Sequence, residues 1–444
     1  MGKGGKILLI LITGILLSLF YFPVEFTFLP GQNSKNLVAA AGLVFLLFSF
    51  IARREFVMPK EVIVLILIAA FVNIFTIISV TYNHTPEISY TNYVVSTIIW
   101  LSGAYAVCSM IRITHGRIDI PLVVAYLTGV SVFQCGMAIA MDMYHPLRNI
   151  IDAIFIQGQE NLQRMNRIYG IGSYLDVAGS RFSCVLGAIA VLIVKDQDRM
   201  SKLSVILYIL AFIIITVIGN MIARTTSVGV VLGLGYLLFS LLKRLFDRDG
   251  RRSSLVWIWA GVLAVVIPLG VTLYRSVPEI NRLIHFGFEG FFAYAETGEF
   301  QTASSNHLVD DMLVFPEETK TWIIGDGYFV NSTNDINYLG DATDKGFYMG
   351  TDIGYLRFLF LFGLPGLFAM IMVMVYSAIT GARAFRRYRM VFIMGLLCGL
   401  IVWLKVATDV FPFLVLGVAS YMVREILDPD KGQSAEEDEE EAVE

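Results

Sequence analysis

The chain has 444 residues, of which 56% are hydrophobic and only 16% are charged, and its formal net charge at pH 7 is −4. A soluble protein of this length could not bury so much apolar surface, so the composition indicates a membrane protein. The net charge says little about partners, because a membrane protein sorts its charges by side, and we expect no nucleic-acid partner. The cysteines lie in apolar runs without metal-ligand spacing, so we expect no metal and no cofactor; they are Cys108, Cys135, Cys184 and Cys398.

Apolar runs of about 16 to 22 residues recur along the chain, and a helix of this length crosses a bilayer at about 1.5 Å per residue. We therefore expect an all-α polytopic membrane protein with about twelve transmembrane helices. The first run follows MGKGGK and has no small-residue cleavage site after it, so we interpret it as a retained span. The expected spans lie near residues 6–22, 36–52, 60–80, 93–111, 119–141, 176–194, 203–220, 226–242, 255–274, 353–378, 390–404 and 408–424.

Most of the 33 lysines and arginines lie in short, alternate connections between these spans, such as residues 243–252 and 383–389. By the positive-inside rule those connections face the cytoplasm, which places both termini there as well. The expected membrane domain covers residues 1–424. Residues 425–444 form an acidic tail that ends in QSAEEDEEEAVE, and we expect this tail to be cytoplasmic and disordered.

Two connections on the outer side are long. The first, residues 142–175, contains PLRNIIDAIFIQ, whose helical apolar spacing suits a helix lying flat on the membrane. The second, residues 275–351 between the ninth and tenth spans, is too apolar and aromatic for a disordered linker, so we expect a small folded cap. Two structured outer loops suggest that the protein acts at its outer face.

Three arginines stand out at the outer ends of spans. Arg224 is the only charged residue between Leu203 and Leu242, while Arg181 and Arg357 each follow an aspartate by five residues. An arginine costs roughly 2.5–3.5 kcal/mol at the centre of a span and less at its rim, where it can also snorkel to the headgroups. Because the planar guanidinium binds phosphate bidentately, a phosphate-bearing lipid would explain why three are kept.

The segment before the tenth span carries a second pattern. TWIIGDGYF at 321–329 ends in a Gly-Asp-Gly turn, and TDIGYLRFLFLFGLPGLF at 351–368 opens the span with an aspartate. Together with Arg224, Thr225 and Ser227, this order of features resembles the Wzy-type polysaccharide polymerases of the O-antigen polymerase and ligase superfamily. The matching residues are Trp322, Gly325, Gly327, Asp352, Gly354, Tyr355, Leu356, Leu359, Gly363 and Gly366, and the resemblance covers roughly residues 200–400.

The resemblance implies a metal-independent glycosyltransferase with a GT-C-like helical body in the bacterial cytoplasmic (inner) membrane. Its donor would be a glycan on undecaprenyl pyrophosphate, its acceptor the next lipid-linked repeat unit, and a chain-length regulator a further partner. Arg224 matches a family arginine that holds the pyrophosphate, and Arg275 or Arg282 matches a second. The ligase branch has a histidine where this chain has Asp352, which favours the polymerase branch.

The attacking sugar hydroxyl needs a proton acceptor within hydrogen-bond reach, and the candidates are Asp352 and His307. A structural alternative exists for each. Asp352 could cap the N-terminus of the tenth span, and His307 could be an ordinary histidine of a surface loop.

Other classes of protein stay open. Besides a ligase of the same superfamily, twelve spans suit a transporter such as a polysaccharide or lipid flippase. Transporters usually place ionisable groups near the bilayer midplane, whereas the charges here lie towards the outer ends of the spans. This distribution favours one-sided chemistry, although no motif excludes a non-catalytic binding or sensor protein.

Overall fold

The computed structural model describes residues 3–54, 58–165, 167–246, 301–332, 335, 338, 346–408 and 410–427, and residues 261–299 except 262–263, 265–266, 269 and 273. Within these ranges the chain is mostly helical, and nine helices are long and apolar enough to cross a membrane. The chain is therefore a helical polytopic membrane protein, as its composition predicts. The nine helices are α1 (Lys3–Tyr21), α2 (Ser34–Arg53), α3 (Lys60–Asn83), α4 (Tyr93–His115), α5 (Ile120–Met143), α8 (Leu175–Asp196), α9 (Lys202–Ile222), α10 (Thr226–Phe246) and α16 (Gly354–Ala384).

The other three expected spans are not among these nine. α17 (Arg389–Val402) and α18 (Phe411–Leu427) lie at the expected eleventh and twelfth positions but are shorter, with 14 and 17 residues. The expected span at residues 255–274 lies mostly outside the described residues. Residues 428–444 of the expected acidic tail lie outside them as well.

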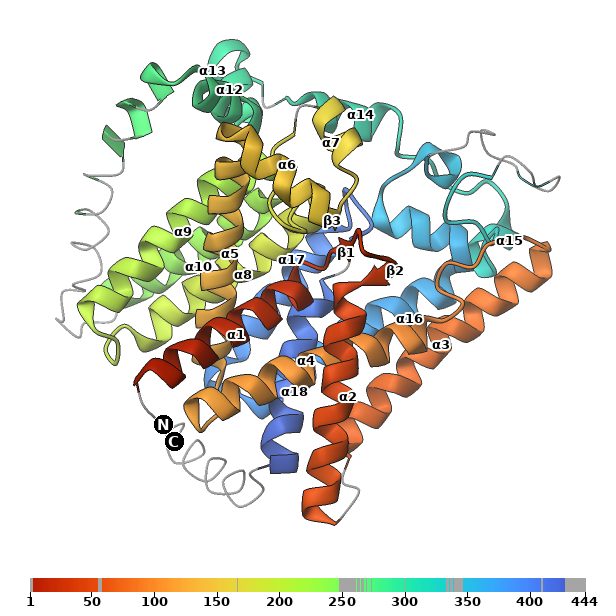
Figure 1. Ribbon diagram of the computed structural model, residues 1–444. Helices are drawn as coiled ribbons and strands as arrows, with labels where there is room; N and C mark the ends of the chain where they lie inside the picture. Colours follow the sequence, from red (N-terminus) through yellow and green to blue (C-terminus); the bar gives the residue numbers. More distant parts are fainter. Residues whose placement is uncertain are drawn as a thin grey trace.

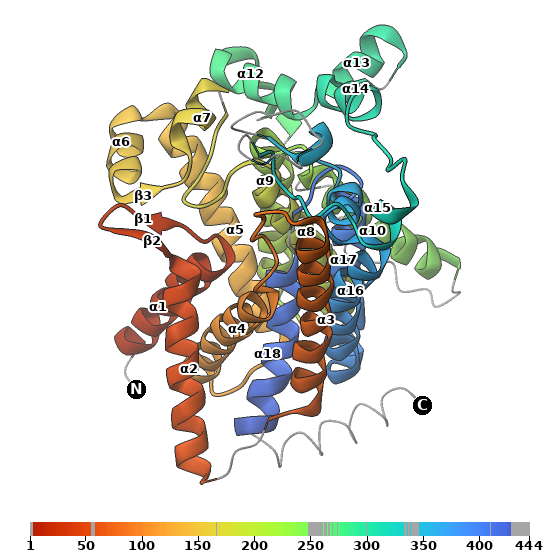
Figure 2. The ribbon, with the colours of Figure 1, turned by 90° about the vertical axis from the view of Figure 1, so that its right-hand side faces the viewer.

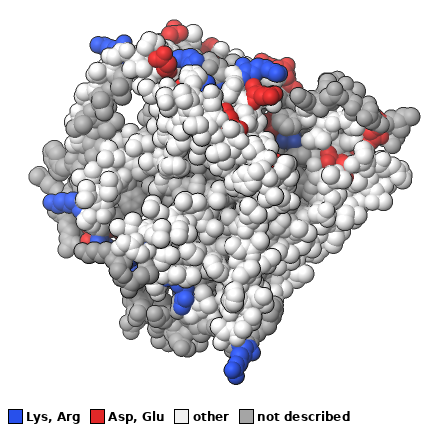
Figure 3. All heavy atoms as spheres, viewed as in Figure 1, with Lys and Arg blue, Asp and Glu red and all other residues white. Residues whose placement is uncertain are grey.

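Short helices gather at one end of the bundle, which we call the loop face (Figures 1 and 2). The start of α1 and the end of α18 lie towards the opposite end. In Figure 3 the acidic side chains gather along the loop-face edge, while the broad front of the bundle is almost free of charge. The helices of the loop face are α6 (His145–Ile154), α7 (Gln159–Arg164), α12 (Pro278–Gly287), α13 (Glu289–Thr297) and α14 (Ala303–Asp310).

Helix α8 is the centre of the bundle and packs against α9, α10 and α17. Nearly all of its residues from Ala178 to Ile193 are buried, and many of them are small. The close approach to α10 depends on Gly229, because a Cβ there would lie 2.3 Å from the Cα of Ser183. Small residues at such crossings allow membrane helices to pack closely, so α8 holds its neighbours in a defined register.

A small antiparallel sheet, which the helical patterns did not predict, lies at the loop-face end of α1. Strands β1 (Glu25–Phe26), β2 (Leu29–Asn33) and β3 (Phe155–Ile156) pair in the order β2-β1-β3. Glu25 pairs with Ile156, and Phe26 with Phe155. The sheet thus ties the α1–α2 connection to the long loop that follows α5.

Candidate functional site

Three helices begin around one cavity beneath the loop face. The cavity has a volume of about 170 Å³. Asp176 lies in the first turn of α8, and Arg224 and Asp352 each lie two residues before the first residue of a helix, α10 and α16 respectively. Because each helix N-terminus carries a partial positive charge, their convergence favours an anion. The lining residues are Arg167, Leu175, Asp176, Ile222, Ala223, Arg224, His307, Leu308, Met312, Asp352 and Lys405.

Arg224 is placed by the tight turn between α9 and α10. The turn is closed by a hydrogen bond from the amide of Thr226 to the carbonyl of Ala223. It packs directly on α8, where the hydroxyl of Ser183 donates to the carbonyl of Thr225 at 2.8 Å. A Cβ on Gly179 of α8 would lie 2.0 Å from the Thr225 hydroxyl, so only glycine allows this approach. The guanidinium is therefore presented to the cavity from a fixed backbone.

The side chain of Arg224 meets two other side chains of the loop face. Its guanidinium lies 2.6 Å from the carboxylate of Glu289 and 4.4 Å from the ring centroid of Phe286. The ion pair involves Nη1 of Arg224, so this donor faces the carboxylate of the loop face.

A second cation, Arg167, lies beside Arg224. Its guanidinium is 3.9 Å from the ring centroid of Phe286, so the same ring contacts both arginines. Burial lowers the pKa of Arg167, and the nearby charge of Arg224 lowers it further. An anion between the two guanidiniums would relieve this repulsion.

Asp352 is held by the turn between α17 and α18. Its carbonyl accepts a hydrogen bond from the amide of Ala407 at 3.1 Å, and the amide of Gly354 donates to Trp403 at 2.9 Å. The capping role considered for Asp352 is wrong, because the N-cap of α16 is Ile353 and no side chain caps it. Burial raises the pKa of the Asp352 carboxyl to about 6, although Arg357 opposes the shift. A carboxylate with this pKa can accept a proton near neutral pH.

Arg357 does not line the cavity but supports Asp352 from behind. Its Nη1 donates to Asp352 at 3.4 Å and its Nη2 donates to the carbonyl of Phe329 at 3.1 Å. The guanidinium lies 3.7 Å from the ring centroid of Phe329 and 4.0 Å from that of Phe347. These contacts hold the guanidinium outside the cavity and make Arg357 a positioning residue rather than a ligand of an anion in the cavity.

Lys405 and Asp176 also line the cavity and form an ion pair. Lys405 Nζ lies 3.2 Å from Asp176 Oδ1, and the Thr225 hydroxyl donates to the same carboxylate at 3.0 Å. Lys405 comes from the same turn that fixes the backbone of Asp352. The α17–α18 connection therefore supplies a cation and positions the carboxylate.

His307 reaches the cavity from α14. Its Nδ1 pairs with the carboxylate of Asp311 on the same helix, and its side chain is 57% exposed. A histidine with one ring nitrogen held by a carboxylate resembles the oriented bases of many enzymes. Its side chain is more exposed to water than that of the half-buried Asp352, which makes Asp352 the stronger candidate for the base.

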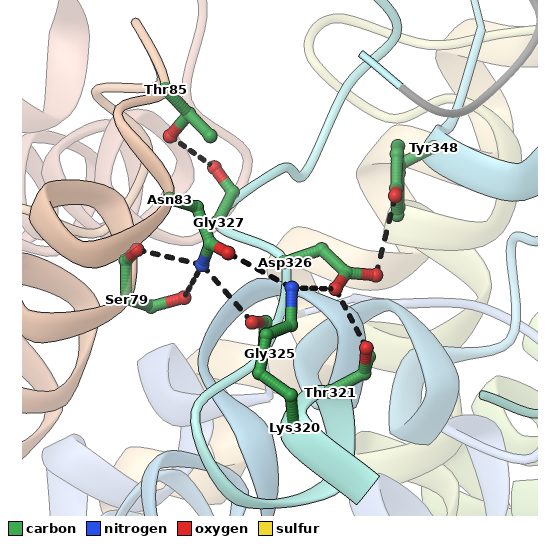
Figure 4. Close-up of polar contacts among 9 residues, drawn as sticks. All are labelled: Ser79, Asn83, Thr85, Lys320, Thr321, Gly325, Asp326, Gly327 and Tyr348. Carbon is green, nitrogen blue, oxygen red and sulfur yellow. Dashed lines mark hydrogen bonds and ion pairs between the residues drawn. The ribbon is translucent and has the colours of Figure 1, made fainter. Parts of the chain in front are cut away.

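The Gly-Asp-Gly turn is held by a cluster of hydrogen bonds, which we call the clamp (Figure 4). Asp326 accepts hydrogen bonds from Lys320 at 2.8 Å and from Thr321 at 2.7 Å, while Lys320 also donates to Asn83 of α3. Thr85 donates to the carbonyl of Gly327 at 2.8 Å. These contacts join α15 (Thr319–Ile323) to the end of α3.

The clamp also fits into a break in α16. Within that helix Gly363 has φ +69°, and a Cβ there would lie 2.5 Å from the carbonyl oxygen of Ile323. Gly325, with φ +86°, lies equally close to the backbone of Leu361. Both positions require glycine for conformation and for space. The motif residues thus dock the long loop against α16.

The remaining predicted arginines lie elsewhere. Arg181 is buried within α8, where its guanidinium is 5.9 Å from the ring centroids of Tyr21 and Phe22. Arg275 is exposed, and Arg282 lies 3.8 Å from Asp142 with its side chain 46% exposed. None of these three lines the cavity. Of the predicted site residues, the cavity brings together Arg224, Asp352 and His307.

The cavity brings two arginines and a lysine next to the carboxylates of Asp176 and Asp352. No family model matches the chain, and no curated protein is significantly similar to it. The assignment of a function therefore depends on the chemistry of this cavity and on the motif resemblance.

Proposed function

We propose that the protein is a glycan polymerase that joins oligosaccharide repeat units carried on undecaprenyl pyrophosphate, as the motif resemblance implies. Arg224, Arg167 and Lys405 bind the diphosphate of the donor. A hydroxyl of the acceptor sugar attacks the anomeric carbon, and its proton passes to the carboxylate of Asp352. The bond from the anomeric carbon to the diphosphate oxygen breaks, and the lipid diphosphate leaves.

The observation that carries this proposal is the grouping of Arg224 and Asp352 in one cavity, although 127 residues separate them in the sequence. Displacement of a diphosphate requires positive charge where the leaving group becomes negative. Two arginines, a lysine and three helix N-termini supply it. The same wall carries a carboxylate whose pKa of about 6 suits a base.

The proposed setting is the bacterial inner membrane, with a GT-C-like body of twelve spans and the loop face directed outwards. In this orientation both termini are cytoplasmic. The loops over the cavity then meet substrates that have already crossed the membrane, and a chain-length regulator would contact the same face.

The test is a reaction of the purified protein in nanodiscs with a synthetic lipid-diphosphate-linked repeat unit. We expect a ladder of products that grow by whole repeat units, and the Arg224→Ala variant should give none. A matched variant, Arg282→Ala, removes a charge outside the cavity and should give the wild-type ladder. Failure of the wild type to extend any lipid-linked repeat unit would overturn the proposal.

A further inference from the structure

A second and larger cavity lies outside the candidate site, between α1 and α5, which cross obliquely at the edge of the bundle (Figure 1). Its volume of about 660 Å³ is within the usual range of small-molecule sites. Along α5 it extends from Leu122 to Gln134, which corresponds to about 18 Å of helix. This is more than half of the roughly 30 Å hydrocarbon core of a bilayer. We call this cavity the α1/α5 groove.

Two glycines hold the α1/α5 groove open. Gly14 on α1 and Gly129 on α5 both line it, and a Cβ at either position would meet nothing within 4 Å. Leu11 and Ile15 also line it and are 59% and 61% exposed. Because both helices are candidate spans, this apolar surface faces the hydrocarbon of the membrane. The shape and the chemistry of the groove suit a long hydrocarbon chain.

The upper end of the groove is joined to the candidate site by one segment of chain. Gln134 donates to the hydroxyl of Ser18 at 3.0 Å and accepts from the amide of Ile171 at 2.8 Å. Ile171 lines the groove, whereas Arg167 and Leu175, four residues to either side, line the charged cavity. Four residues span at most about 14 Å, so the two cavities are neighbours along this segment.

We propose that the α1/α5 groove holds the hydrocarbon tail of the lipid diphosphate whose head group binds in the charged cavity. This inference rests on the proposed function and adds the part of the protein that recognises the hydrocarbon tail of the lipid carrier. The tail leaves the charged cavity over the segment 167–175 and descends between α1 and α5. A short-tailed analogue loses the contacts of the groove but keeps those of the diphosphate.

The test fills the groove with a side chain. Gly129→Leu places an isobutyl group in the groove without a backbone clash, and leucine also favours the helix more than glycine does. Gly235→Leu in α10 is the control, because Gly235 has the same free space and lies on a helix that does not line the groove. Gly14→Leu fills the groove from the facing helix and serves as the second variant.

The probe is a long-chain polyprenyl diphosphate with a photoreactive diazirine in its tail, added to the protein in nanodiscs. In the wild type and in Gly235→Leu we expect crosslinks to α1 and α5, which unlabelled polyprenyl diphosphate competes away. In Gly129→Leu and Gly14→Leu the affinity for this probe should fall by about tenfold, since two or so buried methylene contacts are lost. The affinity for a diphosphate with a ten-carbon tail should stay unchanged.

The controls separate this inference from the proposed function. Equal labelling of α1 and α5 by a phosphatidylglycerol with the same diazirine would show that the groove binds ordinary membrane lipid. This result would overturn the inference. Crosslinks that lie elsewhere, or that Gly129→Leu does not reduce, would overturn it too. Selective labelling by polyprenyl diphosphate without any glycan extension would support the tail site and reject only the polymerase.

Discussion

The guanidinium of Arg224 lies 2.6 Å from the carboxylate of Glu289, so an anion entering the cavity must compete with a side chain of the loop face. Both side chains are partly buried, at 17% and 35% exposed, which makes the pair stronger than one in open water. The loop face thus carries an acidic group at the position where the proposed diphosphate binds. This relationship connects the α12–α13 segment directly to ligand binding.

Replacement of Glu289 by glutamine should therefore tighten diphosphate binding. Glutamine keeps the size of the side chain but removes the competing charge, and we expect an affinity several-fold higher, as is typical when one partner of a partly exposed ion pair is neutralised. Titration of the purified variant with polyprenyl diphosphate measures this. A weaker affinity would mean that Glu289 supports Arg224 instead of competing with the ligand.

The raised pKa of the Asp352 carboxyl predicts that the reaction rate depends on pH. Burial raises the pKa of its carboxyl to about 6, and a base acts only when deprotonated, so the rate should fall as the pH decreases through about 6. Asp352→Asn should lose about 10²–10⁴-fold in rate and should lack this acidic limb. Initial rates of glycan extension between pH 5 and 8 test both statements. An unchanged pH–rate profile in the asparagine variant would show that another group is the base, and His307 would be the next candidate.

Arg357 should act through Asp352 and not through the diphosphate. Its positive charge lowers the pKa of the Asp352 carboxyl, so Arg357→Ala should move the acidic limb of the rate profile to higher pH. Arg357→Lys retains the charge but loses the stacking on Phe329 and Phe347, and its limb should stay near that of the wild type. The affinity for polyprenyl diphosphate should be similar in all three proteins. A large loss of affinity without a shift of the limb would identify Arg357 as a diphosphate ligand.

The Gly-Asp-Gly clamp should contribute to stability rather than chemistry. Gly325→Ala introduces a Cβ at φ +86° and 2.7 Å from the backbone of Leu361, and strain of this kind costs about 1–3 kcal/mol or more. Thermal unfolding in detergent should therefore occur at a lower temperature. Gly235→Ala in α10 is the matched control, because its Cβ would meet nothing within 4 Å and alanine favours a helix. Equal melting temperatures of the two variants would contradict a stabilising role for the clamp.

Hydropathy and run length were sufficient to predict the helical membrane architecture, because a span needs a long apolar run. The small sheet was beyond such patterns: β1 and β3 have two residues each, too few for any periodicity. The expected helix in the first long loop exists as α6, and none of its residues is buried. The expected cap includes α12 to α15, whose positions depend on contacts that run length does not encode.

The candidate site was predictable only in part. The isolation of Arg224 in an apolar stretch identified it, and the motif identified Asp352. Arg181 and Arg357 each follow an aspartate by five residues, but this spacing does not reveal which way a side chain faces. Arg167 and Lys405 were missed as ligands because they reach the cavity only when their connections fold back over the ends of the helices. Several basic residues, Lys405 among them, lie at the outer ends of the expected spans. This grouping was the only signal in the sequence for Lys405.

The most direct test of the central claim is the affinity of the purified protein for polyprenyl diphosphate, measured in nanodiscs for the wild type, Arg224→Ala and Arg282→Ala. If the cations of the cavity hold the diphosphate, Arg224→Ala should bind at least about tenfold more weakly, since a charge-assisted hydrogen bond contributes about 1.5–3 kcal/mol. Arg282→Ala should bind like the wild type. Equal affinity of all three proteins would contradict the account.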